Sequence, residues 1–232
     1  MTNPTIRGIS SMATRQLLAA LVADYKQQLD VAIHIESVGG VDAAKRVQAG
    51  EAFDVVILAS DAIDKLIAAG HIEPHSKVNL VDSGVAVAVR AGSTPPDISS
   101  EAAVKAAVLA AKTISYSTGP SGVALAKLFE RWGIAEQIAS RIVQAPPGVP
   151  VGSLVAKGEV ALGFQQLSEL MGLDGITVVG PLPPEIQITT TFSAGVGTAS
   201  EQADAVKQLL AFMASSQTAE AKRRQGMTPA AH

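Results

Sequence analysis

Apolar runs alternate with segments of helical hydrophobic spacing from Thr5 to Gly70. The run Phe53–Ala59 is almost continuously apolar, which predicts a central parallel strand that is covered on both faces. Apolar positions from Leu17 to Tyr25 recur at helical spacing, which predicts a helix from Ser10 to about Leu29. Further strands are expected over Thr5–Ile9 and Val31–Ser37, and further helices ending at Gln48 and Gly70. This order is typical of a doubly wound α/β sheet.

Two long extended segments, Val81–Arg90 and Ile186–Val196, flank a second α/β series. We interpret them as crossovers between two lobes, so that lobe one comprises residues 1–82 plus 192–232 and lobe two residues 83–191. Each lobe is expected to be a doubly wound, mostly parallel sheet with helices on both faces. The elements expected after the first crossover are strands near Thr113–Ser117, Ile142–Gln144, Ala161–Phe164 and Ile176–Val179, and helices near Ser121–Trp132, Pro150–Lys157, Ser168–Met171, Glu201–Ala214 and Ala219–Arg224.

Composition excludes several classes of protein and site. Hydrophobic residues make up 47% of the chain, and the net charge of −3 comes with no run of Lys or Arg, so a nucleic-acid partner is not expected. No apolar run is long enough to insert into a membrane. Cysteine is absent, which removes disulfides and thiolate metal sites. His71 and His75 lack metal-ligand spacing, so we expect no metal site. We also expect no cofactor and a monomeric protein.

The N-terminal residues lack the charged and apolar regions of a signal peptide. The chain as written therefore predicts a cytoplasmic protein. If a signal peptide has been removed, the prediction becomes a periplasmic one.

Four junctions share one design, in which a strand ends in small polar residues and a helix begins. They are centred on Ser10-Ser11, Gly39-Gly40, Ser60-Asp61 and Ser121-Gly122. Such junctions bring helix N-termini to the carboxyl edge of a sheet, where anions bind favourably. Serine is also a common helix cap, so each junction alone has a purely structural interpretation.

Several of these segments resemble the molybdate-type substrate-binding proteins of ABC transporters. The resemblance is carried by Val47-Gln48-Ala49-Gly50-Glu51-Ala52-Phe53-Asp54-Val55, by Gly119-Pro120-Ser121-Gly122, and by Val155-Ala156-Lys157-Gly158-Glu159-Val160-Ala161-Leu162-Gly163-Phe164. It implies a type II periplasmic-binding-protein fold, an anion held in a cleft between the lobes by hinge closure, and an ABC transporter permease as partner if the protein is exported.

Matched position by position, the family's ligand-binding residues fall on five places in this chain. They are Ser11 with Ser10 beside it, Gly39-Gly40, Ser121, Gly148-Val149 and Gln166. The second place offers backbone amides without a serine hydroxyl, and Gln166 replaces a tyrosine. Molybdate or tungstate and a small carboxylate therefore both stay open as ligands.

A carboxylate ligand is suggested by the side chains that replace the family's donors. Gln165 and Gln166 both donate and accept hydrogen bonds, and Arg7, Arg15 and Arg90 are candidate carboxylate partners. The segments Gly163–Glu169 and Gly180–Gln187 also resemble a branch of this superfamily that includes aconitate isomerases, which shift a double bond by allylic proton transfer.

An isomerase of this kind needs positioned acid–base groups. The candidates are His34, Glu36 and Asp61, although the first two occupy the polar phase of a strand and the third is an expected helix cap. A ligand-sensing module, like the effector domain of a transcription regulator, is a third interpretation. We rank it last because the sequence shows no attached DNA-binding segment.

Overall fold

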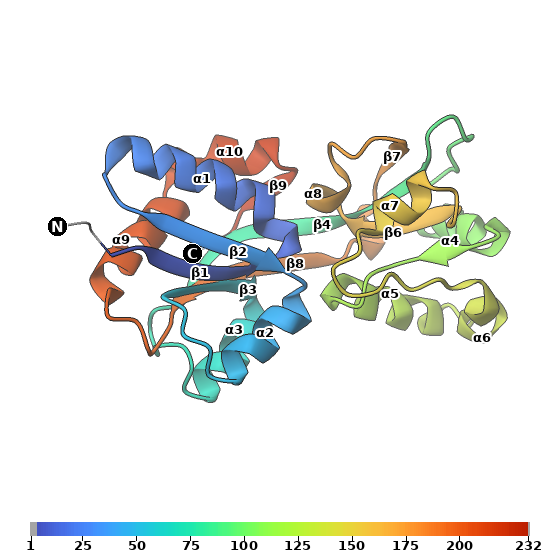
Figure 1. Cartoon of the computed structure of the whole chain (residues 1–232). Coiled ribbons are helices and arrows are strands. Elements are labelled where there is room, and N and C mark those ends of the chain that lie inside the picture. Colours follow the sequence, from blue (N-terminus) through green and yellow to red (C-terminus); the bar gives the residue numbers. More distant parts are fainter. Residues whose placement is uncertain (1–3, 232) are drawn as a thin grey trace. The chain divides into compact units, whose positions relative to one another are not determined.

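Alternate residues of the central strand β3 (Val55–Ala59) pack on opposite faces of a sheet. Val55 and Ile57 join a core cluster with the leucines of helix α1 (Arg15–Gln28), whereas Val56 and Leu58 join a second cluster with α2 (Gly40–Gln48) and α3 (Ser60–Ala68). Figure 1 shows α1 and α2 on opposite sides of the strands. Burial of apolar side chains on both faces explains the uninterrupted hydrophobic run of β3.

The structure, a computed structural model, describes residues 4–231. It divides into two units: unit one is the chain up to Ser83 and again from Thr191, and unit two runs from Gly84 to Thr190. The sequence-based boundaries differ from these by one residue at each crossing. The expectation about a signal peptide, and the ends of predicted lobe one, involve residues 1–3 and 232, which lie outside the described residues.

Unit one contains a parallel core of three strands. Strand β1 (Ile6–Ser11) pairs in parallel with β2 (Ile33–Val38) and with β3, and β3 pairs antiparallel with β8 (Thr189–Val196). The strand order continues from β8 to β4 (Val78–Arg90), and β9 (Met227–Pro229) pairs with β4. Helices α9 (Ala203–Ala214) and α10 (Ala219–Arg224) complete the unit.

Unit two is built around the second half of β4. Its elements are α4 (Glu101–Ala110), β5 (Ile114–Ser115), α5 (Pro120–Arg131), α6 (Ala135–Ile138), α7 (Val151–Ala156), β6 (Leu162–Gln166), α8 (Leu167–Leu170) and β7 (Ile176–Pro181). Strands β5 and β6 are parallel, whereas β4 runs antiparallel to both β6 and β7. The expectation of parallel pairing therefore holds among β1, β2 and β3 and between β5 and β6. It does not hold for β4 and β8, which carry the chain from one unit to the other, or for β7.

Two predicted elements were wrong in detail. The helix expected from Ser10 begins at Arg15, because β1 stays paired with β2 through Ser11 and Met12–Thr14 form a short 3-10 turn. The strand expected over 142–144 is a single bridge between Ile142 and Ile114, which lies just before Pro146-Pro147.

Candidate functional site

The carboxyl ends of three parallel strands meet at one edge of unit one. Ser10 in β1 lies opposite Ser37 in β2 and Ile57 in β3. The Ser10 and Ser37 hydroxyls lie 2.7 Å apart and share a hydrogen bond. The predicted junctions on β1, β2 and β3 are therefore neighbours in the sheet.

Ser11 carries a buried hydroxyl with no partner among the described residues. The residue is 7% exposed, and its Oγ makes no hydrogen bond within residues 4–231. Burying a hydroxyl without a partner costs about 1–3 kcal/mol. Such a cost in a native fold calls for an explanation, and a ligand that accepts this hydrogen bond provides one.

The first turn of α2 lies directly against Ser11. A methyl group placed on Gly40 would be 3.6 Å from the Ser11 Cβ, which is ordinary contact distance. Gly39 is the N-cap residue of α2, and no side chain in the described part of the chain caps the helix. The first turn of α2, with its backbone amides and the positive end of the helix dipole, therefore lies beside Ser11.

Ser60 and Asp61 do not cap α3 in the way the sequence suggested. The N-cap position is Ala59, and Ser60 is already the first helical residue. The Asp61 carboxylate accepts a hydrogen bond from the neighbouring Ala62 amide at 3.0 Å and is exposed. Ser60 is partly buried at the end of β3, beside the other two junctions.

The best-defined junction of unit two is the start of α5. Gly119 is the N-cap, Ser121 is 3% exposed in the first turn, and a side chain at Gly122 would collide with the Ser117 carbonyl. Glycine is therefore required at Gly122 for the loop to fold back on the helix.

Gln165 and Gln166 end β6 and are both 3% exposed. The Gln165 side chain accepts a hydrogen bond from the Val151 amide at 3.0 Å and so caps the start of α7. The Gln166 amide donates to the Thr190 hydroxyl at 3.2 Å. Gly148 and Val149 lie in an exposed turn before α7. Gln165 therefore has a structural role that the sequence did not reveal.

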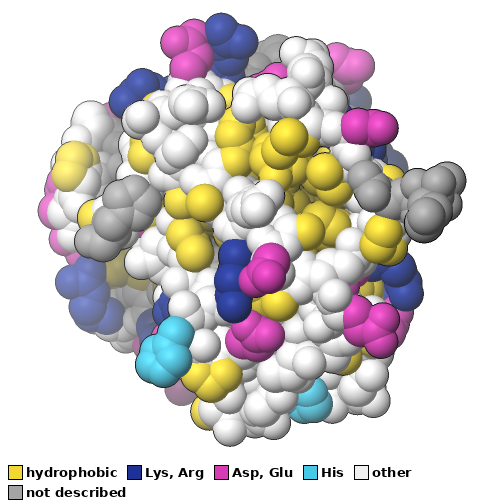
Figure 2. All heavy atoms as spheres, turned by 90° about the vertical axis from the view of Figure 1, so that its left-hand side faces the viewer, with side chains coloured by type: hydrophobic (Ala, Val, Ile, Leu, Met, Phe, Trp, Pro, Cys, Tyr) yellow, Lys and Arg dark blue, Asp and Glu magenta, His cyan; other side chains and the backbone are white. Residues whose placement is uncertain are grey.

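The three arginines occupy different places. Arg7 lies near the amino end of β1 and covers the Phe53 ring, with 5.7 Å from its Cζ to the ring centre. Arg90 ends β4 near the amino end of β6, because Ala88 pairs with Gly163 and Val85 with Gln166. Only Arg15 lies close to a junction, as the first residue of α1. On the face of the described residues that Figure 2 shows, Lys and Arg lie interspersed with Asp and Glu.

Glu36 is held in an ion-pair network and is not a free base. Both of its oxygens accept from Arg46, at 2.7 and 3.1 Å, and Arg46 also pairs with Glu51. The hydrogen bond from Arg46 is the main cause that lowers the pKa of the Glu36 carboxyl below its ordinary value. His34 is exposed on the same strand. The acid–base candidates from the sequence thus have structural partners or lie in solvent.

A carboxyl group that the sequence did not single out lies in unit two. Glu169, in the four-residue α8 that follows Gln166, is partly buried and makes no ion pair or hydrogen bond within residues 4–231. Desolvation by burial raises the pKa of its carboxyl to about 7. No pattern in the sequence indicates this, because the burial of a single polar side chain is a property of the folded structure.

Among the described residues, neither a metal-binding cluster nor a membrane-spanning helix is present. Within 4–231, no group of three or more His, Asp or Glu side chains is arranged to hold a metal ion. None of the helices in that range combines the length and apolar character that a membrane span requires.

Comparison with known proteins identifies the family. The profile of the bacterial extracellular solute-binding proteins matches residues 6–228. This chain belongs to that family. An aconitate isomerase from Pseudomonas sp is 38% identical over 185 residues, which are 79% of this chain and 70% of the relative.

Solved structures of other solute-binding proteins share the fold. The Azotobacter vinelandii periplasmic molybdate-binding protein superposes with a TM-score of 0.80 over 97% of this chain and 100% of its own, at 18% identity. The substrate-binding domain of a molybdenum ABC transporter from Clostridium difficile gives 0.75 over 98% and 99%, at 16% identity. The predicted fold class, the two-lobed α/β fold of type II periplasmic binding proteins, is confirmed.

Proposed function

We propose that this solute-binding protein binds a small organic anion at the carboxyl edge of β1, β2 and β3. The observation that carries the proposal is the buried Ser11 hydroxyl, which has no partner among the described residues and lies against the first turn of α2. Ser11 would donate a hydrogen bond, and the amides of Gly39 and Gly40 would add donors and favourable charge. Ser60 completes the edge from the third strand.

A carboxylate is favoured over a metal oxyanion as the ligand. Gly40 offers no hydroxyl, and Gln166 stands where molybdate-type proteins have a tyrosine, so two of the neutral donors expected for a tetrahedral oxyanion are missing. The relative at 38% identity is an enzyme named for a carboxylic acid. Within unit two, Ser121 and Gln166 are proposed as candidates for ligand binding.

The family also bears on location and partner. The family consists of extracellular solute-binding proteins, which favours the exported form of the two forms that the sequence left open. We propose an ABC transporter permease as the partner of a binding protein of this kind.

A thermal-shift panel tests the proposed ligand class. The panel contains molybdate, tungstate, sulfate, phosphate, and di- and tricarboxylates that include both aconitate isomers. A ligand at about 100 times its dissociation constant should add roughly 2.7 kcal/mol of stability. We expect a shift with at least one carboxylate in the wild type and none in Ser11→Ala. A shift with the metal oxyanions alone would reject the carboxylate proposal.

A second candidate function is cofactor-free isomerisation of an unsaturated polycarboxylate. Two observations favour it: the aconitate isomerase relative, and the half-buried Glu169 carboxyl with a pKa of about 7. A group half ionised near neutral pH is suited to take a proton from one allylic carbon and return it to the other as the double bond moves. This chemistry conserves every atom and needs no co-reactant.

Exchange at the allylic carbon distinguishes the two functions. In deuterium oxide, an isomerase would incorporate deuterium into trans- or cis-aconitate, and Glu169→Gln should lose this exchange while it keeps the thermal shift. The matched control is Glu159→Gln, because Glu159 is an exposed carboxylate of the same unit. If the wild type binds aconitate but incorporates no deuterium, the isomerase function is rejected and solute binding remains as the function.

A further inference from the structure

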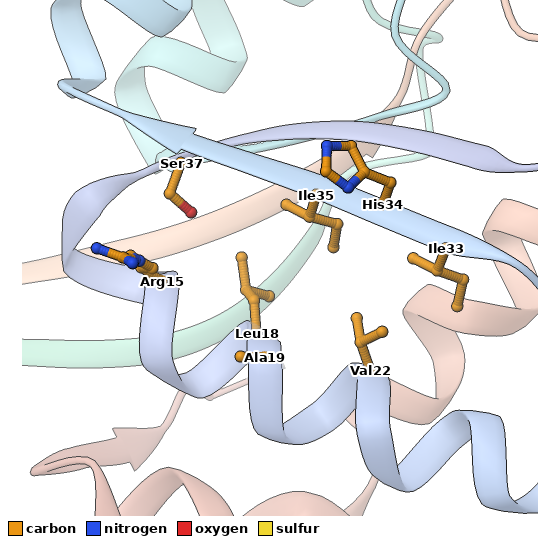
Figure 3. Close-up of a pocket in the computed structure, with 8 residues that line it drawn as sticks. All are labelled: Arg15, Leu18, Ala19, Val22, Ile33, His34, Ile35 and Ser37. Carbon is orange, nitrogen blue, oxygen red and sulfur yellow. The ribbon is translucent and has the colours of Figure 1, made fainter.

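A hollow of about 290 Å³ lies between α1 and β2, on the side of β2 that faces the helix. Figure 3 shows Leu18, Ala19 and Val22 of α1 facing Ile33 and Ile35 of β2. Ile33 and Leu18 are buried, Val22 and Ile35 are partly buried, and Ala19 is exposed. The walls along most of the hollow, which we call the α1–β2 pocket, are therefore apolar.

One end of the α1–β2 pocket is cationic. Arg15 and Ser37 lie together at the end where β2 finishes, whereas the ring of the exposed His34 lies on the side of β2 away from α1 (Figure 3). Within residues 4–231 the Arg15 side chain makes no ion pair or hydrogen bond. No lining residue among those described is acidic. An unpaired guanidinium at the end of an apolar slot complements a carboxylate that carries a hydrocarbon tail.

We propose that the α1–β2 pocket is a second binding site, for a medium-chain aliphatic carboxylate held by Arg15. The pocket extends from Ile33 to Ser37, which at about 3.3 Å per residue gives roughly 13 Å, long enough for an unbranched acid of about eight carbons. Its tail would lie between α1 and β2, and its carboxylate would reach Arg15. This proposal does not depend on the function proposed for the carboxyl edge of β1, β2 and β3, where Ser11 lies.

Octanoate is the probe, and amide chemical shifts report where it binds. Saturable shifts are expected in residues 15–22 and 33–37 of the wild type. Ala19→Trp, which fills the pocket, should abolish them, whereas Ala23→Trp, an exposed position one turn later that does not line the pocket, should leave them unchanged. Absence of saturation at millimolar octanoate, or full binding to Ala19→Trp, would overturn the proposal.

Two charge tests complete the experiment. Arg15→Gln should weaken octanoate binding about tenfold, as expected for loss of one charge-assisted contact, whereas Arg90→Gln should not change it. Octanol should bind more weakly than octanoate to the wild type, and equal binding would contradict the role of Arg15. Ser11→Ala should keep octanoate binding. Its loss in that variant would show that the two sites are one and would overturn the second site alone.

Discussion

Ser11 is the residue in which stability and function oppose each other. Its hydroxyl is buried without a partner among residues 4–231, so Ser11→Ala should leave the free energy of unfolding unchanged or raise it by up to about 1 kcal/mol. The matched control is Ser193→Ala, because the buried Ser193 hydroxyl donates to Asn79 at 2.8 Å. That variant should lose about 1 kcal/mol. Urea unfolding of both proteins makes the comparison, and equal losses would contradict the interpretation of Ser11.

Glu169 should make the stability of the protein fall as pH rises. Its pKa of about 7 in the folded chain lies above the value of about 4.3 expected when unfolded. Between these values the folded chain binds more protons, so the contribution of Glu169 is fully present below about pH 4 and is lost as pH rises through 7.

The corresponding variant is Glu169→Gln, which keeps the shape and removes the ionisation. It should stabilise the protein by about 1–3 kcal/mol at pH 8 and by much less at pH 4.5. Glu159→Gln should show no such pH dependence, since that carboxylate is exposed. Thermal unfolding across this pH range provides the test, and parallel curves for wild type and Glu169→Gln would contradict it.

At the scale of elements, the start of α5 depends on one glycine. A Cβ at Gly122 would collide with the Ser117 carbonyl, whereas a Cβ at Gly119 would lie 3.5 Å from the Ser117 Oγ, in ordinary contact. Gly122→Ala should therefore cost about 1–3 kcal/mol, and Gly119→Ala much less. Both positions have negative or ordinary backbone angles, so the difference isolates the steric term. Comparable unfolding midpoints would show that the loop adapts.

Elements with a clear hydrophobic pattern within their own residues could be predicted from the sequence. The apolar run of β3 and the helical spacing of α1 gave correct elements, although α1 begins later than expected. Strand β9 could not be predicted, because its three residues have no pattern and form a strand only by pairing with β4. The antiparallel course of β4 beside β6 likewise depends on tertiary pairing.

The same distinction applies to the site. The junctions at Ser10-Ser11 and Gly39-Gly40 could be predicted, because they depend on local strand-to-helix chemistry and β1 and β2 are neighbours. The pairing of Glu36 with Arg46 and the capping of α7 by Gln165 depend on contacts between different elements, which the sequence pattern does not reveal. The burial of Glu169 is likewise a property of the folded structure.

At the scale of the whole molecule, the central claim is that a solute-binding protein of this family holds a small carboxylate through Ser11. Isothermal titration of the carboxylate that gives the largest thermal shift, into wild type and into Ser11→Ala, tests it most directly. We predict saturable binding to the wild type and at least about tenfold weaker binding to Ser11→Ala, since a hydrogen bond to a charged group is worth about 1.5–3 kcal/mol. Equal affinity in a fully folded Ser11→Ala variant would contradict the claim and exclude the carboxyl edge of β1 as the binding site.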